Sequence, residues 1–236
     1  MLIAAVVLAA SGSTASAPAF QSAADLQRWL TYYYRQPRPD LVVAALVALE
    51  AELPRHGSTL EAEARRGGMR SFFGLVLAKS PAAVTAVAQH DFTPGTRRFV
   101  AEALWRCGTE PCAEARAHLG VDPSPAAPPD TRSAPVDSAA AIDDLWASYS
   151  ATGDPAYVER VIAALPSAGA GGTADELTRG TVGGAALWSL ASNATQYPEV
   201  LAVCVAAAVR ADQTRRPLLE EVIRRARQAR GEDEGS

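Results

Sequence analysis

The sequence predicts an all-α protein of two tandem homologous helical units, about five helices each, with helical-repeat or bundle-like packing. Two observations predict this architecture. Helix start signals recur along the 236 residues, and the Ala-rich segments between them carry apolar residues at the helical period. The same series of signals also occurs twice in the same order, at a separation of about 117 residues.

The first unit is predicted at residues 20–120, where each helix is introduced by a side-chain cap or by a proline at its first position. These signals are Ser22, Pro39, the Ser58-x-x-Glu61 capping box, Ser80-Pro81 and Thr93-Pro94. The third helix contains Gly67-Gly68, where we expect an interruption or kink, or a close crossing with another helix.

Residues 121–137 are rich in Pro and Ala and lack an apolar period, which predicts an extended linker. The start signals then repeat over a second unit at residues 138–230, and a charged tail follows at residues 231–236. The second series consists of Ser138, Asp154-Pro155, the Thr173-x-x-Glu176 box, Tyr197-Pro198 and Asp212.

Seven features of the first unit recur in the second in the same order, which predicts a tandem duplication. The matches are Trp29 with Trp146, Tyr32 with Tyr149, Pro39 with Pro155, the two capping boxes, Gly67-Gly68 with Gly183-Gly184, Pro81 with Pro198, and TRRFVAE (from Thr96) with TRRPLLE (from Thr214). Two such units can form separate bundles or pack face to face, each covering apolar surface of the other.

The N-terminus predicts a secretory signal peptide at residues 1–19. A short apolar run from Leu2 to Ala10 precedes two A-x-A sites, at residues 15–17 and 17–19. The alternative is that this run is the first helix of the fold. We therefore expect an exported protein, periplasmic or secreted. No later run is long and apolar enough to predict a stable membrane span after signal cleavage.

The formal net charge of −4 argues against a nucleic-acid partner, because nucleic-acid affinity rests largely on cations that neutralise phosphates. Of the three cysteines, Cys107 and Cys112 bracket a turn-like GTEP segment, and this spacing favours a structural disulfide in an oxidising compartment. Cys204 lies in an apolar run, which favours a small buried side chain.

No catalytic residue, metal site or cofactor is predicted. His56, His90 and His118 are isolated at helix ends or loops, and the H-E-x-x-H, G-x-S-x-G and phosphate-loop motifs are absent from the sequence. The adjacent carboxylates at residues 143–144 and 220–221 would point to different helix faces, so they do not form natural acid–base pairs.

The strongest candidate binding surface is the triplet Tyr32, Tyr33 and Tyr34, followed by Arg35. Three consecutive helical residues cover about 300° of arc, so we expect at least one exposed tyrosine. Exposed tyrosine beside arginine is typical of recognition surfaces. The alternative is a tyrosine that packs at the rim of the core and places its hydroxyl in solvent.

A second candidate is the duplicated arginine pair, formed by Arg97 and Arg98 in one unit and by Arg215 and Arg216 in the other. Cations in the first turn of a helix are disfavoured by the helix dipole, so each pair is expected to have a partner. That partner is either an acid one turn on, Glu102 or Glu220, or an acidic ligand.

The segments DLWASYSATGDPAYVERVIAAL (144–165) and ALWSLASNATQYPEVLAVC (186–204) resemble an uncharacterised family of predicted exported bacterial α-helical proteins. That family carries LW…ATGD…V..II.AL and WSL.SNA…P.V…C segments. The resemblance covers most of the second unit. The first unit lacks the T-G-D and W-S-L-x-S-N-A residues. The resemblance implies export and a helical fold, and it implies no activity and no catalytic residues.

Together these features predict an exported, non-catalytic helical interaction module that binds a protein partner in the cell envelope. The alternative is an enzyme or a small-ligand-binding protein with its site between the two units, which would require a deep polar cleft there. A third possibility is a purely structural envelope protein. A patch of aromatic and arginine side chains around residues 32–34 would favour the module.

Overall fold

The computed structural model describes residues 19–52, 60–121, 130–165 and 174–231. Within these ranges the regular structure is helical and contains no strand, which confirms the all-α prediction. The predicted signal peptide up to residue 18, the caps Ser58 and Thr173, and residues 232–236 of the predicted tail lie outside the described residues.

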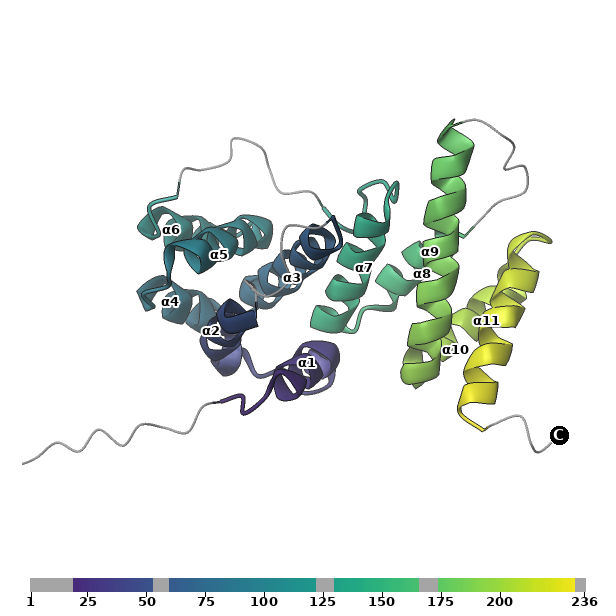
Figure 1. Cartoon of the computed structure of the whole chain (residues 1–236), viewed down its shortest axis with the longest axis horizontal. Coiled ribbons are helices and arrows are strands. Elements are labelled where there is room, and N and C mark those ends of the chain that lie inside the picture. The colour runs from purple at the N-terminus through teal and green to yellow at the C-terminus, as the bar shows by residue number, and fades with distance from the viewer. Residues whose placement is uncertain (1–18, 53–59, 122–129, 166–173, 232–236) are drawn as a thin grey trace, which may run out of the picture.

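The helices follow one another along the chain with short connections (Figure 1). The first half contains α1 (Ala23–Tyr32), the 3₁₀ turns η1 (Tyr33–Arg35) and η2 (Pro39–Leu41), α2 (Val42–Glu52), α3 (Leu60–Ala78), α4 (Pro81–Gln89), α5 (Pro94–Cys107) and α6 (Glu110–His118). The second half contains α7 (Ala139–Thr152), α8 (Pro155–Ala163), α9 (Ala174–Gln196), α10 (Pro198–Arg210) and α11 (Arg215–Ala229).

Most of the predicted caps act as expected. The side chains of Ser22, Ser80, Ser138 and Asp154 each accept a hydrogen bond from a backbone N–H in the first turn of the helix that follows. Thr93 precedes α5 without such a bond, and its hydroxyl donates to Glu50. Local sequence therefore sets where the helices begin.

The predicted interruption at Gly67-Gly68 is wrong, because α3 runs unbroken through both residues. The pair instead allows a close helix crossing. A Cβ on Gly68 would lie 3.3 Å from the carbonyl oxygen of Asp143 and 3.5 Å from the Cβ of Ala147, both on α7. Glycine here lets two backbones approach each other.

Buried side chains form two clusters, one in each half of the chain. The first draws on α1 to α6 and includes Phe73 and Leu104, and the second draws on α7 to α11 and includes Leu190 and Leu219. The clusters meet at α3 and α7. Leu75 on α3 packs against both, and Ala151 on α7 belongs to the first cluster.

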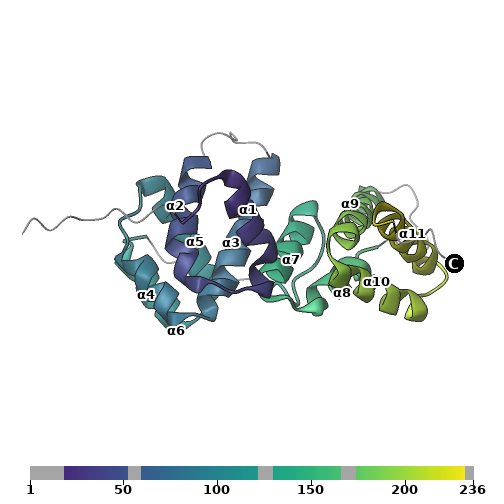
Figure 2. The same ribbon diagram turned by 90° about the horizontal axis from the view of Figure 1, so that it is seen from below.

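Helix α7 joins the two halves, and its contact with α3 is the most extensive of any pair of helices in the described residues. Figures 1 and 2 both show α7 between α3 and α9, with α10 and α11 farther along the molecule. At this contact Asp144 accepts a hydrogen bond from Ser71 Oγ at 3.0 Å and pairs with Arg106 at 3.4 Å, and Arg106 donates to Ser71 Oγ at 2.8 Å.

The predicted linker is only partly a linker. Residues 130–133 form a turn, Arg132 pairs with Asp154, and Arg160 on α8 donates to the carbonyls of Arg132 and Ala134. Val136 packs against the second cluster. Backbone carbonyls and one apolar side chain thus bind residues 132–136 to the second half.

The predicted disulfide is confirmed, since the sulfurs of Cys107 and Cys112 lie 2.03 Å apart. The bond connects the end of α5 to the start of α6. Cys204 is fully buried on α10, and burial raises the pKa of its thiol to about 12.

None of the described helices is by itself long and apolar enough to cross a bilayer. Residues 67–78 of α3 together with α4 satisfy the length and composition criteria as a pair, but the two segments are bent by 117° where they meet.

Candidate functional site

The tyrosine triplet lies where the two halves of the chain meet. Helix α1 ends at Tyr32 and η1 begins at Tyr33, which is buried, whereas Tyr32 and Tyr34 are each partly buried. The expectation of an exposed tyrosine is therefore wrong. Side chains from α7 and from the start of α10 cover the faces that a lone helix would expose.

Tyr34 packs against the second half at two points. Its ring lies 5.2 Å from that of Tyr149 on α7, and it contacts Gly153, which ends α7 with a φ of +69°. A Cβ on Gly153 would stand 2.8 Å from Tyr34 Cδ2. Glycine is therefore required at this position for both its backbone conformation and its lack of a side chain.

Tyr32 and Arg35 contact the start of α10. The Tyr32 ring lies 5.6 Å from that of Tyr197, and its hydroxyl accepts a hydrogen bond from Gln196 at 3.3 Å. Arg35 lies 5.0 Å from the centre of the Tyr32 ring and donates to Glu199 at 2.9 Å. The triplet and Arg35 thus hold the two halves together.

Tyr149 and Tyr197 of this junction are neutral at ordinary pH. Burial, and then its hydrogen bond with Tyr34, raises the pKa of Tyr149 above its usual value. Burial, and then the neighbouring Tyr32, raises the pKa of Tyr197 to about 12. The hydroxyls therefore act as hydrogen-bonding groups and not as acids.

The outer side of α1, η1 and η2 carries an open depression of about 680 Å³, which we call the α1 groove. Its aromatic lining comes from Phe20, Trp29, Tyr32 and Tyr33. The Trp29 ring is held by edge contacts at 5.7 Å to Phe20 and 5.1 Å to Tyr33. A groove with an aromatic wall fixed in this way can accept an apolar side chain of a partner.

Three arginines, Arg28, Arg35 and Arg38, also line the α1 groove. The Arg28 side chain is 73% exposed and lies 3.8 Å from Asp25, which is a weak pairing. Arg38 binds Asp40 through two hydrogen bonds, at 2.9 and 2.6 Å, which lower the pKa of Asp40. Arg28 is therefore the cation best placed to meet a carboxylate of a partner.

The four arginines of the duplicated pairs each contact groups of their own half. Arg97 donates to Asp91 at 3.0 Å and to the carbonyl of Phe92, and Arg98 lies 3.8 Å from Glu102 one turn on. Arg215 and Arg216 donate to the carbonyls of Ala163 and Ala211. None of these contacts reaches the tyrosine triplet. Partners within the chain thus account for these positions.

Arg216 also lines a second open depression, of about 600 Å³, between α10 and α11. Its apolar wall includes Val209, which is 76% exposed, and its polar wall includes Glu220, Arg224 and Arg227. The polar lining of this depression carries both positive and negative side chains, so its charge does not indicate a particular class of ligand.

The residues that the structure describes contain no group of three or more His, Cys, Asp or Glu side chains arranged to hold a metal ion. His90 packs on Phe92 at 4.5 Å, and His118 Nδ1 bonds the backbone carbonyl of Glu114 at 2.8 Å. His56 lies outside the described residues. These two histidines have local structural contacts and are not brought together.

Sequence reasoning missed Trp188, whose side chain is 74% exposed on α9. The signal for it was present. Val182, Ala186, Leu190 and Ala194 repeat every four residues and are buried, which leaves Trp188 on the opposite side of the helix. The exposed Trp188 lies one turn from Gly184, on a surface that contains none of the predicted tyrosine or arginine sites.

Comparisons with protein-family models, with curated proteins and with solved structures found no match for this chain.

Proposed function

We propose that this protein is an exported, non-catalytic interaction module of two homologous helical units, which binds a protein partner through the α1 groove. The observation that carries the proposal is the open groove itself, in which fixed aromatic rings and the exposed Arg28 stand side by side. Aromatic and arginine side chains dominate the energetics of protein interfaces.

Burial supports the proposal that the two units are homologous. The buried positions of α2, Val42, Ala45, Leu46 and Leu49, recur 116 residues later at Val158, Val161, Ile162 and Leu165. Those of α4, Ala83, Val84 and Val87, recur 117 residues later at Val200, Leu201 and Cys204. Burial also aligns Tyr149 with Tyr33, one residue from the match that the letters alone favour.

Export is supported by the apolar N-terminal run and is compatible with the bonded pair Cys107–Cys112, since disulfides persist in oxidising compartments.

The alternative, a ligand site between the units, has less support. A small cavity does lie there, lined by Arg106, Asp144, Thr131 and neighbouring apolar residues. Its volume is about 40 Å³, which admits a water molecule, whereas small-ligand sites are typically about 300 Å³ or larger.

The test is a crosslinked pull-down with the tagged mature protein from the envelope fraction of its host. The groove variant is Arg28→Glu, and the matched control is Arg210→Glu, whose side chain is 72% exposed on α10. One stoichiometric partner that is lost in Arg28→Glu and kept in Arg210→Glu would support the proposal. A partner kept in both, or no stoichiometric partner, would overturn it, and loss in Arg98→Glu instead would move the site to α5.

A further inference from the structure

The outer face of α9 exposes a glycine and a tryptophan, while its other residues are partly buried. We define it by Gly184, Leu187, Trp188, Ala191 and Thr195, which lie one or two turns apart. Trp188 is 74% exposed, and a Cβ added to Gly184 would meet nothing within 4 Å. A glycine and a tryptophan exposed together in the middle of a long helix stabilise neither the helix nor the core.

The corresponding positions 116 residues earlier are buried or partly buried, except for Lys79, which is exposed just after the end of α3. These positions hold Gly68, Ser71, Phe72, Leu75 and Lys79. Gly68 lies against the backbone of α7, Ser71 donates to Asp144, and Leu75 packs against both clusters. Phe72, which corresponds to Trp188, is only 2% exposed. On α3 this face is therefore a packing surface for another helix, α7.

Arg106, which pairs with Asp144 of α7, also has a counterpart in the second half. The buried residues Val100, Ala103 and Cys107 of α5 recur 119 residues later at Leu219, Val222 and Ala226 of α11. This separation is one residue longer than the 118 of the matched TRR segments, and it places Arg225 at the position of Arg106, which pairs with Asp144.

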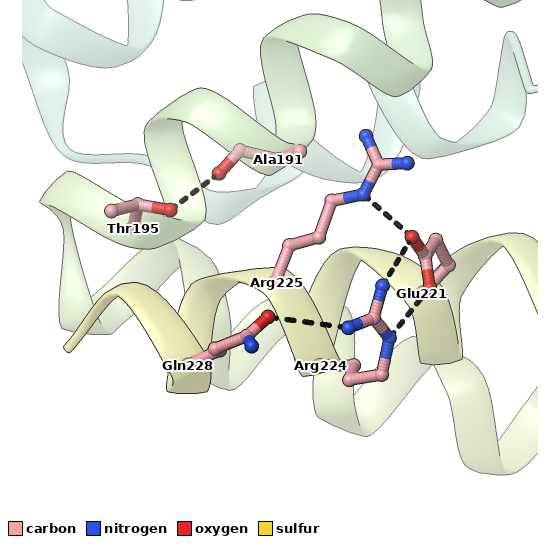
Figure 3. A network of polar contacts seen from close by, with 6 residues as sticks. All are labelled: Ala191, Thr195, Glu221, Arg224, Arg225 and Gln228. Atoms are coloured by element: carbon pink, nitrogen blue, oxygen red, sulfur yellow. Dashed lines mark hydrogen bonds and ion pairs between the residues drawn. The ribbon is translucent and has the colours of Figure 1, made fainter. Parts of the chain in front are cut away.

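The Arg225 side chain is 58% exposed and donates to Glu221 at 2.6 Å. Figure 3 shows Arg224 and Arg225 converging on Glu221, with Ala191 and Thr195 of α9 in the same close-up. An exposed guanidinium can exchange a neighbouring carboxylate for one that a partner supplies.

We propose that the outer face of α9, together with Arg225, is a docking site for an acidic helix of another protein. The partner helix carries a small residue where it crosses Gly184 and an Asp or Glu that reaches Arg225, as α7 does on α3 with Ala147 and Asp144. Trp188 packs against the incoming helix.

Charge and occupancy argue against a second copy of this chain as the occupant. In another copy of the chain, α7 already packs against α3 of that same copy. Its α1 carries Arg28 at the position 116 residues before Asp144, and this cation would meet Arg225. A different protein that presents an acidic helix is therefore the occupant. The site is separate from the α1 groove, so either can fail without the other.

The test measures binding of a fluorescein-labelled peptide of residues 138–153 to the full chain by anisotropy. The peptide is held helical by a hydrocarbon staple replacing Ile142 and Tyr149, whose side chains face the second cluster in the intact chain, and its helicity is checked by circular dichroism. We expect saturable binding that weakens at least tenfold in Gly184→Leu and in Arg225→Glu.

The controls are Gly95→Leu, at an open position of α5, and Arg210→Glu, and both should bind as the parent does. A peptide with Asp144→Arg should regain affinity for the Arg225→Glu chain. Absence of binding at millimolar peptide would overturn the proposal, as would equal binding by all chain variants or loss only in Gly68→Leu. Self-association of the chain that Gly184→Leu abolishes would replace the acidic partner with a second copy.

Discussion

In the duplication that we propose, helices α3 and α9 occupy corresponding places, yet Phe72 on α3 is buried and Trp188 on α9 is exposed. On α3, Gly68 lies under α7 and Phe72 is buried against Trp29 and Tyr33, whereas on α9 both Gly184 and Trp188 face solvent. If the two units are homologous as we propose, the same surface packs within the chain in one half and is partly exposed in the other.

The largest expected difference concerns the two aromatic residues. Phe72→Ala should lower the free energy of unfolding by about 3–5 kcal/mol, because it removes a fully buried ring. Trp188→Ala should change it by less than about 0.5 kcal/mol, because the side chain is mostly exposed. Urea unfolding followed by circular dichroism measures both, and similar losses for the two variants would contradict the comparison.

The carboxylate at the centre of the α3–α7 contact should have the next largest effect. Asp144→Asn weakens the pairing with Arg106 and leaves that mostly buried guanidinium with less compensation. We expect a loss of about 2 kcal/mol in the free energy of unfolding, the scale of a hydrogen bond to a charged group. Asp25→Asn, at the exposed Arg28 pair, is the control and should cost less than about 0.5 kcal/mol.

The two glycines should respond differently to alanine. Gly184→Ala should raise the free energy of unfolding by about 1 kcal/mol, because alanine favours the helix and its methyl group meets open space. Gly68→Ala should bring no such gain, since its methyl group presses on the Asp143 carbonyl at 3.3 Å. Equal gains at both positions, measured by thermal unfolding, would show that α7 does not lie close against Gly68.

The smallest effect is a pH dependence at Glu221. Hydrogen bonds from Arg224 and then Arg225 lower the pKa of Glu221 to about 2 from its ordinary 4.5. A carboxyl with a lowered pKa in the folded state stabilises the protein above about pH 4.5, and this contribution is lost as the pH falls towards 2. The pair is exposed, so salt should reduce the effect.

Carboxyl NMR titration of Glu221 measures this shift directly. The midpoint should rise in Arg224→Ala and, by less, in Arg225→Ala. An acidic helix that takes Arg225 should raise it as well. A midpoint near 4.5 in the parent chain would show that the arginines do not hold this carboxylate.

Local features of the sequence predicted most of the helix boundaries. Ser80, Ser138 and Asp154 cap the helices that follow them, because a cap involves only residues within one turn. The disulfide was also predictable, since Cys107 and Cys112 are five residues apart.

Contacts between distant segments decided what the sequence could not predict. The sequence left Gly68 as either a kink or a close crossing, and only the position of α7, 75 residues later, decides for the crossing. It likewise could not show that Gly153 and Tyr149 pack against Tyr34. The apolar period of α9 could have predicted that Trp188 is exposed. That exposure is informative about function only because Phe72, at the position that we propose corresponds to it, is buried.

The most direct test of the comparison is hydrogen exchange of the backbone amides of α3 and α9, without and with saturating stapled peptide. In the free chain, amides at residues 68–76 should exchange at least tenfold more slowly than those at residues 184–192, because α7 lies across Gly68 whereas Gly184 and Trp188 are exposed. The peptide should slow exchange at residues 184–192 and leave residues 68–76 unchanged. We claim that α9 carries an exposed counterpart of the α3 surface on which α7 packs. Equal exchange rates for the two sets of amides in the free chain, or protection by the peptide at α3 alone, would contradict this claim.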